Sequence, residues 1–394
     1  MPEPTDTTTG RYLVLIDEGS AAAGARELSS VAGIRTASTL EGATAESLGT
    51  VDGVIYSNLG VAVVNAQPDQ VNALAAAVEA PGPIALVEPE RVVQALAAPA
   101  QENVTAAVDE SVFTWGLQAV GANISTATGK GVRLAVLDTG FTVNHPDFAG
   151  RTVLTQSFIA GETVDDAHGH GTHCIGSAAG PRKPASGGPG YGVAYEADIY
   201  AGKVLSNAGF GSDGGILAGI DWALNNGCAV ISMSLGSAVR PGTPYSQVYE
   251  TVGRRALSKG TLIIAAAGNE SRRPDKIAPV GHPANCPSIL AVGAIDDQRA
   301  VAFFSCGTVD TVGQVDVVAP GVNVYSSWNG KSGDSLHKRI QGTSMATPHV
   351  AGVAALMAQQ HNARGWELWA RLMQSARRLG VPATDAGAGL VQAP

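Results

Sequence analysis

Hydrophobic and polar positions follow two different patterns along this chain. Up to about residue 94, short segments alternate apolar and polar positions or repeat them with a helical period. These periods predict strands at 12–16, 53–56, 61–65 and 84–88, and helices at 21–31 and 67–79. The order strand–helix–strand–strand–helix–strand predicts a small α+β open-faced sandwich.

From about Trp115 onward, short and almost continuously apolar segments alternate with helical segments. The apolar segments are VRLAVLD, IYAGKVL, AVISMSLG, TLIIAAAGN, SILAVGAI and VDVVAPG. Near-continuous hydrophobicity is typical of strands buried on both faces. The second part is therefore predicted to be an α/β domain with a mostly parallel central sheet and helices on both faces.

A polar stretch of small residues separates the two parts and has no apolar periodicity. We therefore predict four segments along the chain. They are a disordered N-terminus at 1–10, a compact domain at 11–96, a linker at 97–110 and the large domain at 111–394.

Composition excludes several classes of partner. The chain has 394 residues and a net charge of -9, and no basic stripe is present to neutralise phosphates, so we expect no nucleic-acid partner. No apolar run is long enough for a membrane span. The start, MPEPTDTTTG, lacks a basic segment followed by an apolar one, so no secretory signal is predicted. As encoded, this indicates a cytoplasmic protein, or an extracellular one if a signal has been removed.

A serine within GTSMATPHVAG, residues 342–352, is the first candidate for chemistry. This stretch reads as a loop that enters an apolar helix, which puts Ser344 at a helix N-terminus. Unpaired backbone N–H groups and the positive end of the helix dipole meet there. A hydroxyl at such a place can act as a nucleophile when a base lies nearby.

Three further residues supply what such a nucleophile needs. Asp138 ends the strand VRLAVLD, His170 is predicted to begin a helix in HGHGTHCIG, and Asn269 closes TLIIAAAGN. Catalytic groups gather outside the carboxyl ends of strands in open α/β sheets. The amide of Asn269 is placed to stabilise a developing oxyanion.

The histidines at 168, 170 and 173 also invite a metal-binding interpretation. However, an HExxH spacing is absent and no third ligand is placed beside His170 and His173. We expect His173 to be a hydrogen-bonded core residue and His168 to be exposed in a loop.

The chain order Asp, His, Ser distinguishes this set from trypsin-like enzymes and α/β-hydrolases, and subtilisin is the reference case for it. The chain resembles the subtilisin-like serine proteases, or subtilases. The matching strings are AVLDTG, HGHGTHCIG, ISMSLG, AAAGNE, FFSCG, VVAPG and GTSMATPHVAG. They extend from about Trp115 to the closing GAGLVQA.

The resemblance implies a serine endopeptidase. Asp138, His170 and Ser344 match the catalytic triad, and Asn269 matches the oxyanion-hole side chain, joined by the backbone N–H of Ser344. Ser344 would attack a peptide carbonyl while His170 takes up its proton and Asp138 orients the imidazole. No cofactor is needed for this chemistry.

The resemblance also implies an extended substrate between two strand edges, with the glycines allowing close approach. One edge would be Ser234, Leu235 and Gly236, and the other Gly209, Phe210 and Gly211. Ala266, Gly268 and Gly281 would line the pocket for the residue before the cleaved bond, with Glu270 near its rim. Small walls favour an apolar or aromatic residue there.

Residues 11–96 resemble the inhibitory propeptide of subtilases, and VEPERVVQAL resembles its last segment. This predicts a self-inhibited zymogen, an intramolecular inhibitor and cleavage after Leu96. A permanent accessory domain is the alternative. Protein or peptide substrates and a monomeric state are expected. A catalytically dead binding module and an acyltransferase that uses the same acyl-enzyme are the competing functions.

Cysteines and calcium complete the expectations from the resemblance. Cys174, four residues after His170, is expected to be a buried free thiol, whereas pairing of Cys286 with Cys306 is left open. Asp147 matches a calcium-ligand position of the family, so a structural calcium ion is one option. The loop SAAGPRKPASGGPGYGVA lacks the Asn-rich ligand string of calcium-loaded relatives, which leaves that site open.

Overall fold

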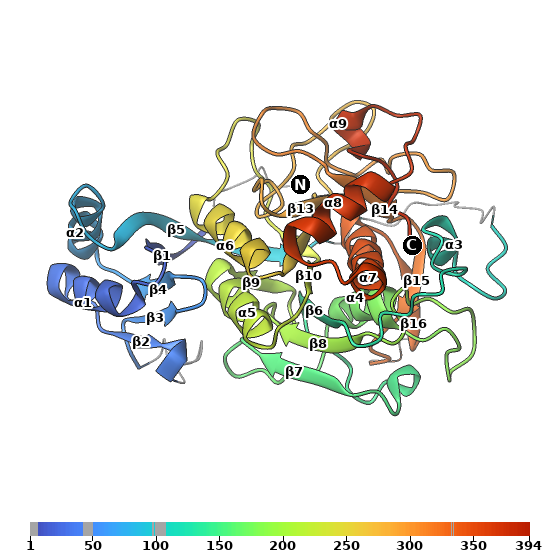
Figure 1. Cartoon of the computed structure of the whole chain (residues 1–394), viewed down its shortest axis with the longest axis horizontal. Coiled ribbons are helices and arrows are strands. Elements are labelled where there is room, and N and C mark those ends of the chain that lie inside the picture. Colours follow the sequence, from blue (N-terminus) through green and yellow to red (C-terminus); the bar gives the residue numbers. More distant parts are fainter. Residues whose placement is uncertain (1–6, 42–49, 97, 99–107, 332, 334) are drawn as a thin grey trace.

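Figure 1 shows the computed structural model of the protein, which describes residues 7–41, 50–96, 98, 108–331, 333 and 335–394. A small N-terminal unit, blue in Figure 1, lies beside a larger unit that contains the rest of the described chain. No helix within these ranges is both long and apolar enough to cross a membrane.

The N-terminal unit is an open-faced sandwich with two helices on one sheet. Its elements are β1 (Thr8–Ile16), α1 (Ala21–Ala32), β2 (Thr36–Ser38), η1 (Thr39–Glu41), β3 (Gly53–Tyr56), β4 (Val61–Asn65), α2 (Pro68–Val78) and β5 (Ile84–Ala95). The prediction of a disordered segment up to residue 10 is wrong for Thr8–Gly10, which belong to β1. Residues 1–6, the rest of that predicted segment, lie outside the described ranges.

Both faces of this sheet are buried, and the alternation along β1 shows how. Val14 and Ile16 pack with α1 and α2 in a core of the unit itself. Leu13 and Leu15 point the other way and join the core of the larger unit. Successive side chains of a strand point to opposite faces, so one short segment serves two cores.

The larger unit is built on a parallel sheet of strand order β14-β13-β12-β10-β6-β8-β7, and each of its neighbouring pairs is parallel. The prediction of an α/β fold with a mostly parallel sheet is confirmed. The strands are β6 (Arg133–Asp138), β7 (Val153–Ser157), β8 (Asp198–Lys203), β10 (Val230–Met233), β12 (Leu262–Ala266), β13 (Leu290–Ile295) and β14 (Val317–Pro320). β10, β12 and β13 are buried along their whole length, as a sheet covered on both faces requires.

Helices cover this sheet, and two of them carry His170 and Ser344. α4 packs against α7, and both contact strands of the sheet, whereas α5 contacts β6 and β8, and α6 contacts β12. The helices are α3 (Trp115–Ala119), η3 (Pro146–Phe148), α4 (His170–Ala179), α5 (Asp213–Asn225), α6 (Gln247–Ser258), α7 (Thr343–His361), α8 (Gly365–Ser375) and α9 (Ala383–Ala386). A separate antiparallel pair is formed by β15 (Val324–Ser327) and β16 (His337–Ile340).

One strand joins the two units. β5 leaves the N-terminal sheet and enters the larger unit, where it pairs antiparallel with β9 (Phe210–Ser212) on one side and β11 (Leu235–Gly236) on the other. The sequence predicted only its first half, 84–88. The second half, RVVQA, pairs with these two edge strands of the larger unit. Its residues therefore occupy the edges predicted to bind substrate.

Candidate functional site

Asp138 and His170 meet at the carboxyl end of β6. Asp138 is the last residue of β6 and His170 is the first residue of α4, in agreement with the predicted positions. The His170 Nδ1 donates to Asp138 Oδ1 at 2.7 Å, and both side chains are buried. The backbone N–H of Thr139 donates to the same oxygen at 2.7 Å. This geometry fixes the tautomer of His170 and leaves its Nε2 as the reactive nitrogen.

The electrostatics of this pair favour a basic imidazole. Burial alone lowers the pKa of His170, because it disfavours the charged form. The charge of Asp138 and its hydrogen bond, with a contribution from Cys174, outweigh burial and raise the pKa of His170 above its usual value. The Nε2 of His170 is buried and has no hydrogen-bond partner among the described residues.

Ser344 lies at the second position of α7, as predicted for a residue at a helix N-terminus. Its Oγ donates to the carbonyl of Ser234 at 3.0 Å, and the Ser234 Oγ donates to the carbonyl of Ser344 at 2.8 Å. Cys174 ties Ser344 to His170, because its Sγ lies 3.5 Å from the Ser344 carbonyl and 3.8 Å from His170 Nδ1. In this arrangement the hydroxyl points to a carbonyl and not to the imidazole.

The side-chain amide of Asn269 contacts the carbonyl of Leu96. Its Nδ2 donates to the Leu96 oxygen at 2.7 Å. Its Oδ1 accepts from the backbone N–H of Thr343 at 2.9 Å and from the Thr343 hydroxyl at 3.0 Å. The same Leu96 oxygen would lie 2.7 Å from a Cβ at Gly342, where φ is 150°. Only glycine leaves room there for the carbonyl to approach the start of α7.

The two predicted cleft edges hold residues 92–96 as a strand. On the β9 side, Gly211 pairs with Val93, Phe210 pairs with Gln94, and the Ala95 N–H donates to the Gly209 carbonyl at 2.9 Å. On the other side, Leu235 pairs with Ala95 and Gly236 with Gln94, and the Leu96 N–H lies 3.4 Å from the Ser234 carbonyl.

Ala266, Gly268 and Gly281, which are predicted to line the first pocket, lie close together. Gly236 of the predicted cleft edge lies next to the Leu96 side chain. The Leu96 side chain is buried, and its Cδ1 would lie 3.4 Å from a Cβ at Gly236. Ala266 ends β12, and the Gly281 N–H donates to the carbonyl of the next residue, Ala267, at 2.9 Å.

Glu270 and Cys306 lie next to Gly268, one of the residues predicted to line the pocket. A Cβ at Gly268 would approach Glu270 Oε2 to 2.6 Å and Cys306 Sγ to 2.9 Å. The Cys306 Sγ donates to Glu270 Oε2 at 3.2 Å. The carboxylate of Glu270 is thus tied to a thiol in the core.

The other two histidines of the HGHGTH segment differ in environment. His173 is buried, and its Nε2 lies 3.1 Å from the Val324 carbonyl, in agreement with the predicted core residue. The prediction that His168 is exposed is wrong. Its ring packs edge-on against His170 with 6.1 Å between centroids, next to Gly209. A histidine beside a bound strand becomes half-buried, which its loop sequence does not reveal.

All four cysteines are free and buried. Cys174 agrees with the predicted buried thiol. Cys286 Sγ lies 3.7 Å from the Ser246 carbonyl, whereas Cys306 Sγ contacts Glu270, so the two do not pair. Burial raises the pKa of Cys174 to about 11. A thiol with that pKa is protonated at neutral pH and is a poor competitor for the role of nucleophile.

Asp147 does not have the surroundings of a calcium ligand. Its carboxylate accepts from the Ser186 hydroxyl at 2.7 Å, the Tyr191 hydroxyl at 2.7 Å and the His337 Nε2 at 2.8 Å. Burial raises the pKa of Asp147, but these donors outweigh it and lower the pKa below its usual value. Calcium takes six to eight oxygen ligands. Among the described residues, the other potential metal ligands beside this carboxylate are the ring nitrogens of His145 and His337, and a set with two imidazoles to one carboxylate does not suit calcium.

Sequence reasoning missed two glutamates of β5 that contact helix N-termini of the larger unit. Glu88 accepts from the Ser246 hydroxyl at 2.5 Å and from the Gln247 N–H at 2.8 Å, at the start of α6. Glu90 accepts from the Gly214 N–H at 2.8 Å, at the start of α5. Negative charge is favoured at helix N-termini. Glu88 and Glu90 are two residues apart and therefore lie on the same face of the strand. This spacing is the sequence feature that could have indicated a shared binding role.

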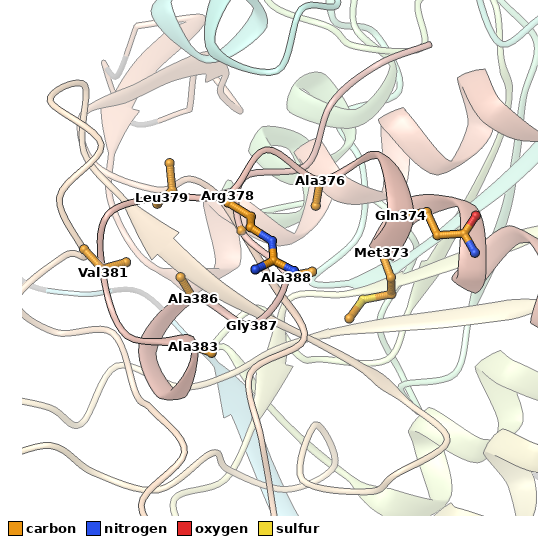
Figure 2. Close-up of a pocket in the computed structure, with 11 residues that line it drawn as sticks. Met373, Gln374, Ala376, Arg378, Leu379, Val381, Ala383, Ala386, Gly387 and Ala388 are labelled. Atoms are coloured by element: carbon orange, nitrogen blue, oxygen red, sulfur yellow. The ribbon is translucent and has the colours of Figure 1, made fainter.

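A cavity of about 500 Å³ lies apart from these residues. Figure 2 shows it between the end of α8, α9 and the connecting loop, with Met373, Arg378, Leu379 and Ala386 on its wall. None of the predicted site residues lines it. Asp138, His170, Ser344 and Asn269 lie instead near the strands β9 and β11 that pair with β5.

Comparison with known proteins agrees with this geometry. The sequence profile of the subtilase family matches residues 129–390. A thermostable alkaline protease of Halalkalibacterium halodurans is 38% identical over 299 residues, which cover 74% of this chain and 75% of that protein. Subtilisin Savinase of Lederbergia lenta is 40% identical over 63% of this chain and 84% of that protein. The alkaline elastase YaB of a Bacillus species is 39% identical over 71% of this chain and 68% of that protein.

A parallel α/β sheet that brings together an acid, a histidine and a serine in this chain order defines a hydrolase of the serine-protease type. The chain belongs to the subtilase family and is a subtilisin-like serine protease. Proteases of this family act on proteins or peptides and need no cofactor for catalysis.

Proposed function

We propose that the chain is the self-inhibited precursor of a serine endopeptidase that cleaves its own Leu96–Ala97 bond. One observation carries this proposal. The Leu96 carbonyl accepts from Asn269 Nδ2 at 2.7 Å while the residues before it pair with both cleft edges. That is the position a substrate carbonyl must take to be attacked by Ser344.

In this proposal the residues act in the following order. Ser344 Oγ rotates from the Ser234 carbonyl toward the Leu96 carbon, and His170 Nε2 takes up its proton. Asn269 and the N-terminal end of α7 stabilise the oxyanion. His170 then protonates the leaving amine of Ala97, which leaves Leu96 as an ester on Ser344 Oγ. A water molecule, deprotonated by His170, attacks this ester and releases the Leu96 carboxylate and the Ser344 hydroxyl, and Asp138 stabilises the imidazolium in both steps.

The cleaved N-terminal unit then remains in place as an inhibitor. Glu88 and Glu90 sit at the starts of α6 and α5, and the Arg255 guanidinium donates to the Ile16 carbonyl at 3.1 Å, so contacts extend well beyond the cleft. Beyond the cleaved bond, the Ala98 N–H donates to the Gln341 carbonyl at 3.0 Å. We further propose that the first pocket prefers apolar residues, since the chain presents Leu96 to it.

Timed mass spectrometry of purified wild type beside Ser344→Ala tests the proposal. We expect wild type to split between Leu96 and Ala97 and the variant to stay whole. If both proteins stay whole, the N-terminal unit is a permanent accessory domain and the precursor hypothesis fails. If the wild type splits at another bond, the assignment of Leu96 to the reacting position is wrong. Splitting of both proteins at this bond would mean that Ser344 is not the nucleophile.

A further inference from the structure

A buried acid–histidine pair outside the triad lies under β5 and has no part in the proposed chemistry. Asp213 begins α5 directly after the cleft strand β9, and His282 follows Gly281. The His282 Nε2 lies 2.8 Å from Asp213 Oδ1, and both residues are 1% exposed. Tyr249 holds the pair from α6, because its ring packs edge-on against His282 and its hydroxyl donates to the Asp213 carbonyl at 3.0 Å.

Hydrogen-bond chemistry decides which atom of this pair is free for a ligand. A carboxylate only accepts, so His282 Nε2 carries the proton in that bond. In the neutral imidazole the other nitrogen, Nδ1, then has a lone pair and must accept. It lies 3.2 Å from the Nη1 of Arg91 on β5. A guanidinium has only donors, so it complements this acceptor.

Asp213 of this pair also binds the backbone of Arg91. The Arg91 N–H donates to Asp213 Oδ2 at 2.8 Å, and the next residue, Val92, pairs with Ser212 of β9. Asp213 therefore binds any residue at this position through its main chain, and its negative charge favours a cation there. His282 contacts only the side chain.

The strand register gives this position a place relative to the cleaved bond. Counting back from Leu96 as the first residue before that bond, Arg91 is the sixth. Gln94, the third, is exposed. A substrate that replaces residues 91–96 between β9 and β11 would put its own sixth residue on Asp213 and His282.

We propose that the Asp213–His282 pair is a subsite that selects a basic side chain, arginine above all, six residues before the cleaved bond. This inference rests on the proposed endopeptidase function and adds a substrate preference to it. Arg91 is then the chain's own occupant of the subsite. A glutamate there would meet the charge of Asp213, and a glutamine would keep one donor without the positive charge.

Quenched fluorescent peptides with the sequence X-Val-Val-Gln-Ala-Leu-Ala-Ala-Pro test the subsite, with X as Arg, Gln or Glu. The enzyme is the full chain after its own processing. We expect kcat/KM to fall roughly three- to tenfold from Arg to Gln, as for one hydrogen bond to a charged group at a half-exposed site, and further for Glu. The matched control peptide carries Arg at the exposed third position in place of Gln, and should show no such gain.

Two enzyme variants assign the effect to the pair. His282→Phe keeps a ring against Tyr249 but removes the acceptor, and Asp213→Asn removes the charge. In each variant, the ratio of kcat/KM for the Arg peptide to kcat/KM for the Gln peptide should be close to one, even if the absolute rates change. A ratio near one in the wild type, or a ratio unchanged in both variants, would overturn the subsite. Failure of the processed enzyme to cleave any peptide would instead count against the proposed function.

Discussion

The amide of Asn269 is held at one end by Thr343 and offers its other end to the Leu96 carbonyl. A donor fixed in advance costs no reorganisation when negative charge develops on that carbonyl. Asn269→Ala should therefore lower kcat about a hundred- to a thousandfold, with a smaller change in KM. Steady-state kinetics on one peptide measure both constants. A variant with raised KM and unchanged kcat would contradict this role, and Thr343→Ser, which keeps the hydroxyl, should lose much less than Thr343→Val.

In the proposed mechanism, the His170–Asp138 bond sets the pH dependence of the reaction. A general base must be neutral, so activity falls as the pH drops through the pKa of His170, which Asp138 raises. Asp138→Asn removes that charge, and burial then lowers the pKa. The acid limb of the kcat/KM profile should move to lower pH, while the maximum falls about ten-thousandfold. Asp165→Asn is the control, because it changes an exposed carboxylate in the loop between β7 and α4. It should leave the acid limb of the kcat/KM profile at the wild-type pH. An unmoved limb in Asp138→Asn would assign the titration to another group.

At the residue scale, the position of a candidate catalytic residue was predictable where that residue lies at or near the end of an element. Asp138, His170, Ser344 and Asn269 follow strands or begin helices, and the fold brings those ends together. The surroundings of His168 and Asp147 depend on segments far away in the sequence. His168 lies against Gly209, and Asp147 accepts from His337. No local pattern contains either contact.

At the scale of elements, β5 places the charges of Glu88 and Glu90 at two helix N-termini, and the proposed inhibition depends on this match. Glu90 is fully buried, with an ion pair to Arg11 Nε at 2.6 Å and a bond from the Gly214 N–H. Glu90→Gln keeps the shape but removes the charge from both contacts. We expect the processed unit to bind about ten- to a hundredfold more weakly, since charge-assisted bonds are worth about 1.5–3 kcal/mol.

The residual inhibition of the processed chain on dilution measures that binding. Glu79→Gln, at an exposed position after α2, is the matched control and should leave the inhibition unchanged. Equal inhibition by the Glu90 and Glu79 variants would show that the charges at the helix starts do not hold the unit.

Element predictions succeeded where a strand is apolar along its length and failed where the strand forms only through distant pairing. The strands at 53–56 and 61–65 are almost entirely apolar, with alternate residues in the two cores, and both were predicted with the observed bounds. β7 and β16 were not predicted. Their residues are exposed or only partly buried, so neither strand contains an apolar run. The second half of β5 is polar in part and forms a strand through the edges of β9 and β11. Such a strand cannot be inferred from its own sequence.

At the scale of the whole molecule, the N-terminal unit shares one of its two cores with the rest of the chain. Leu13, Leu15 and Val63 pack into the core of the larger unit, whereas Val14 and Leu74 belong to the unit's own core. A domain of this size buries a smaller fraction of its surface on folding than a large domain does, and is only marginally stable. The fragment 1–96 should therefore lack a cooperative thermal transition by circular dichroism and gain one when the processed enzyme is added.

Two neighbouring residues of β1 separate the contributions of the two cores. Leu13→Ala empties space against the larger unit, so it should destabilise the Ser344→Ala full chain by about 2–5 kcal/mol. Val14→Ala removes a group from the unit's own core and should destabilise the full chain as well. Denaturant unfolding of the two full-chain variants measures each contribution, and the same unfolding of fragment 1–96 should show no cooperative transition. A fragment that unfolds cooperatively and loses as much stability from Leu13→Ala as from Val14→Ala would mean that the unit folds without the larger unit.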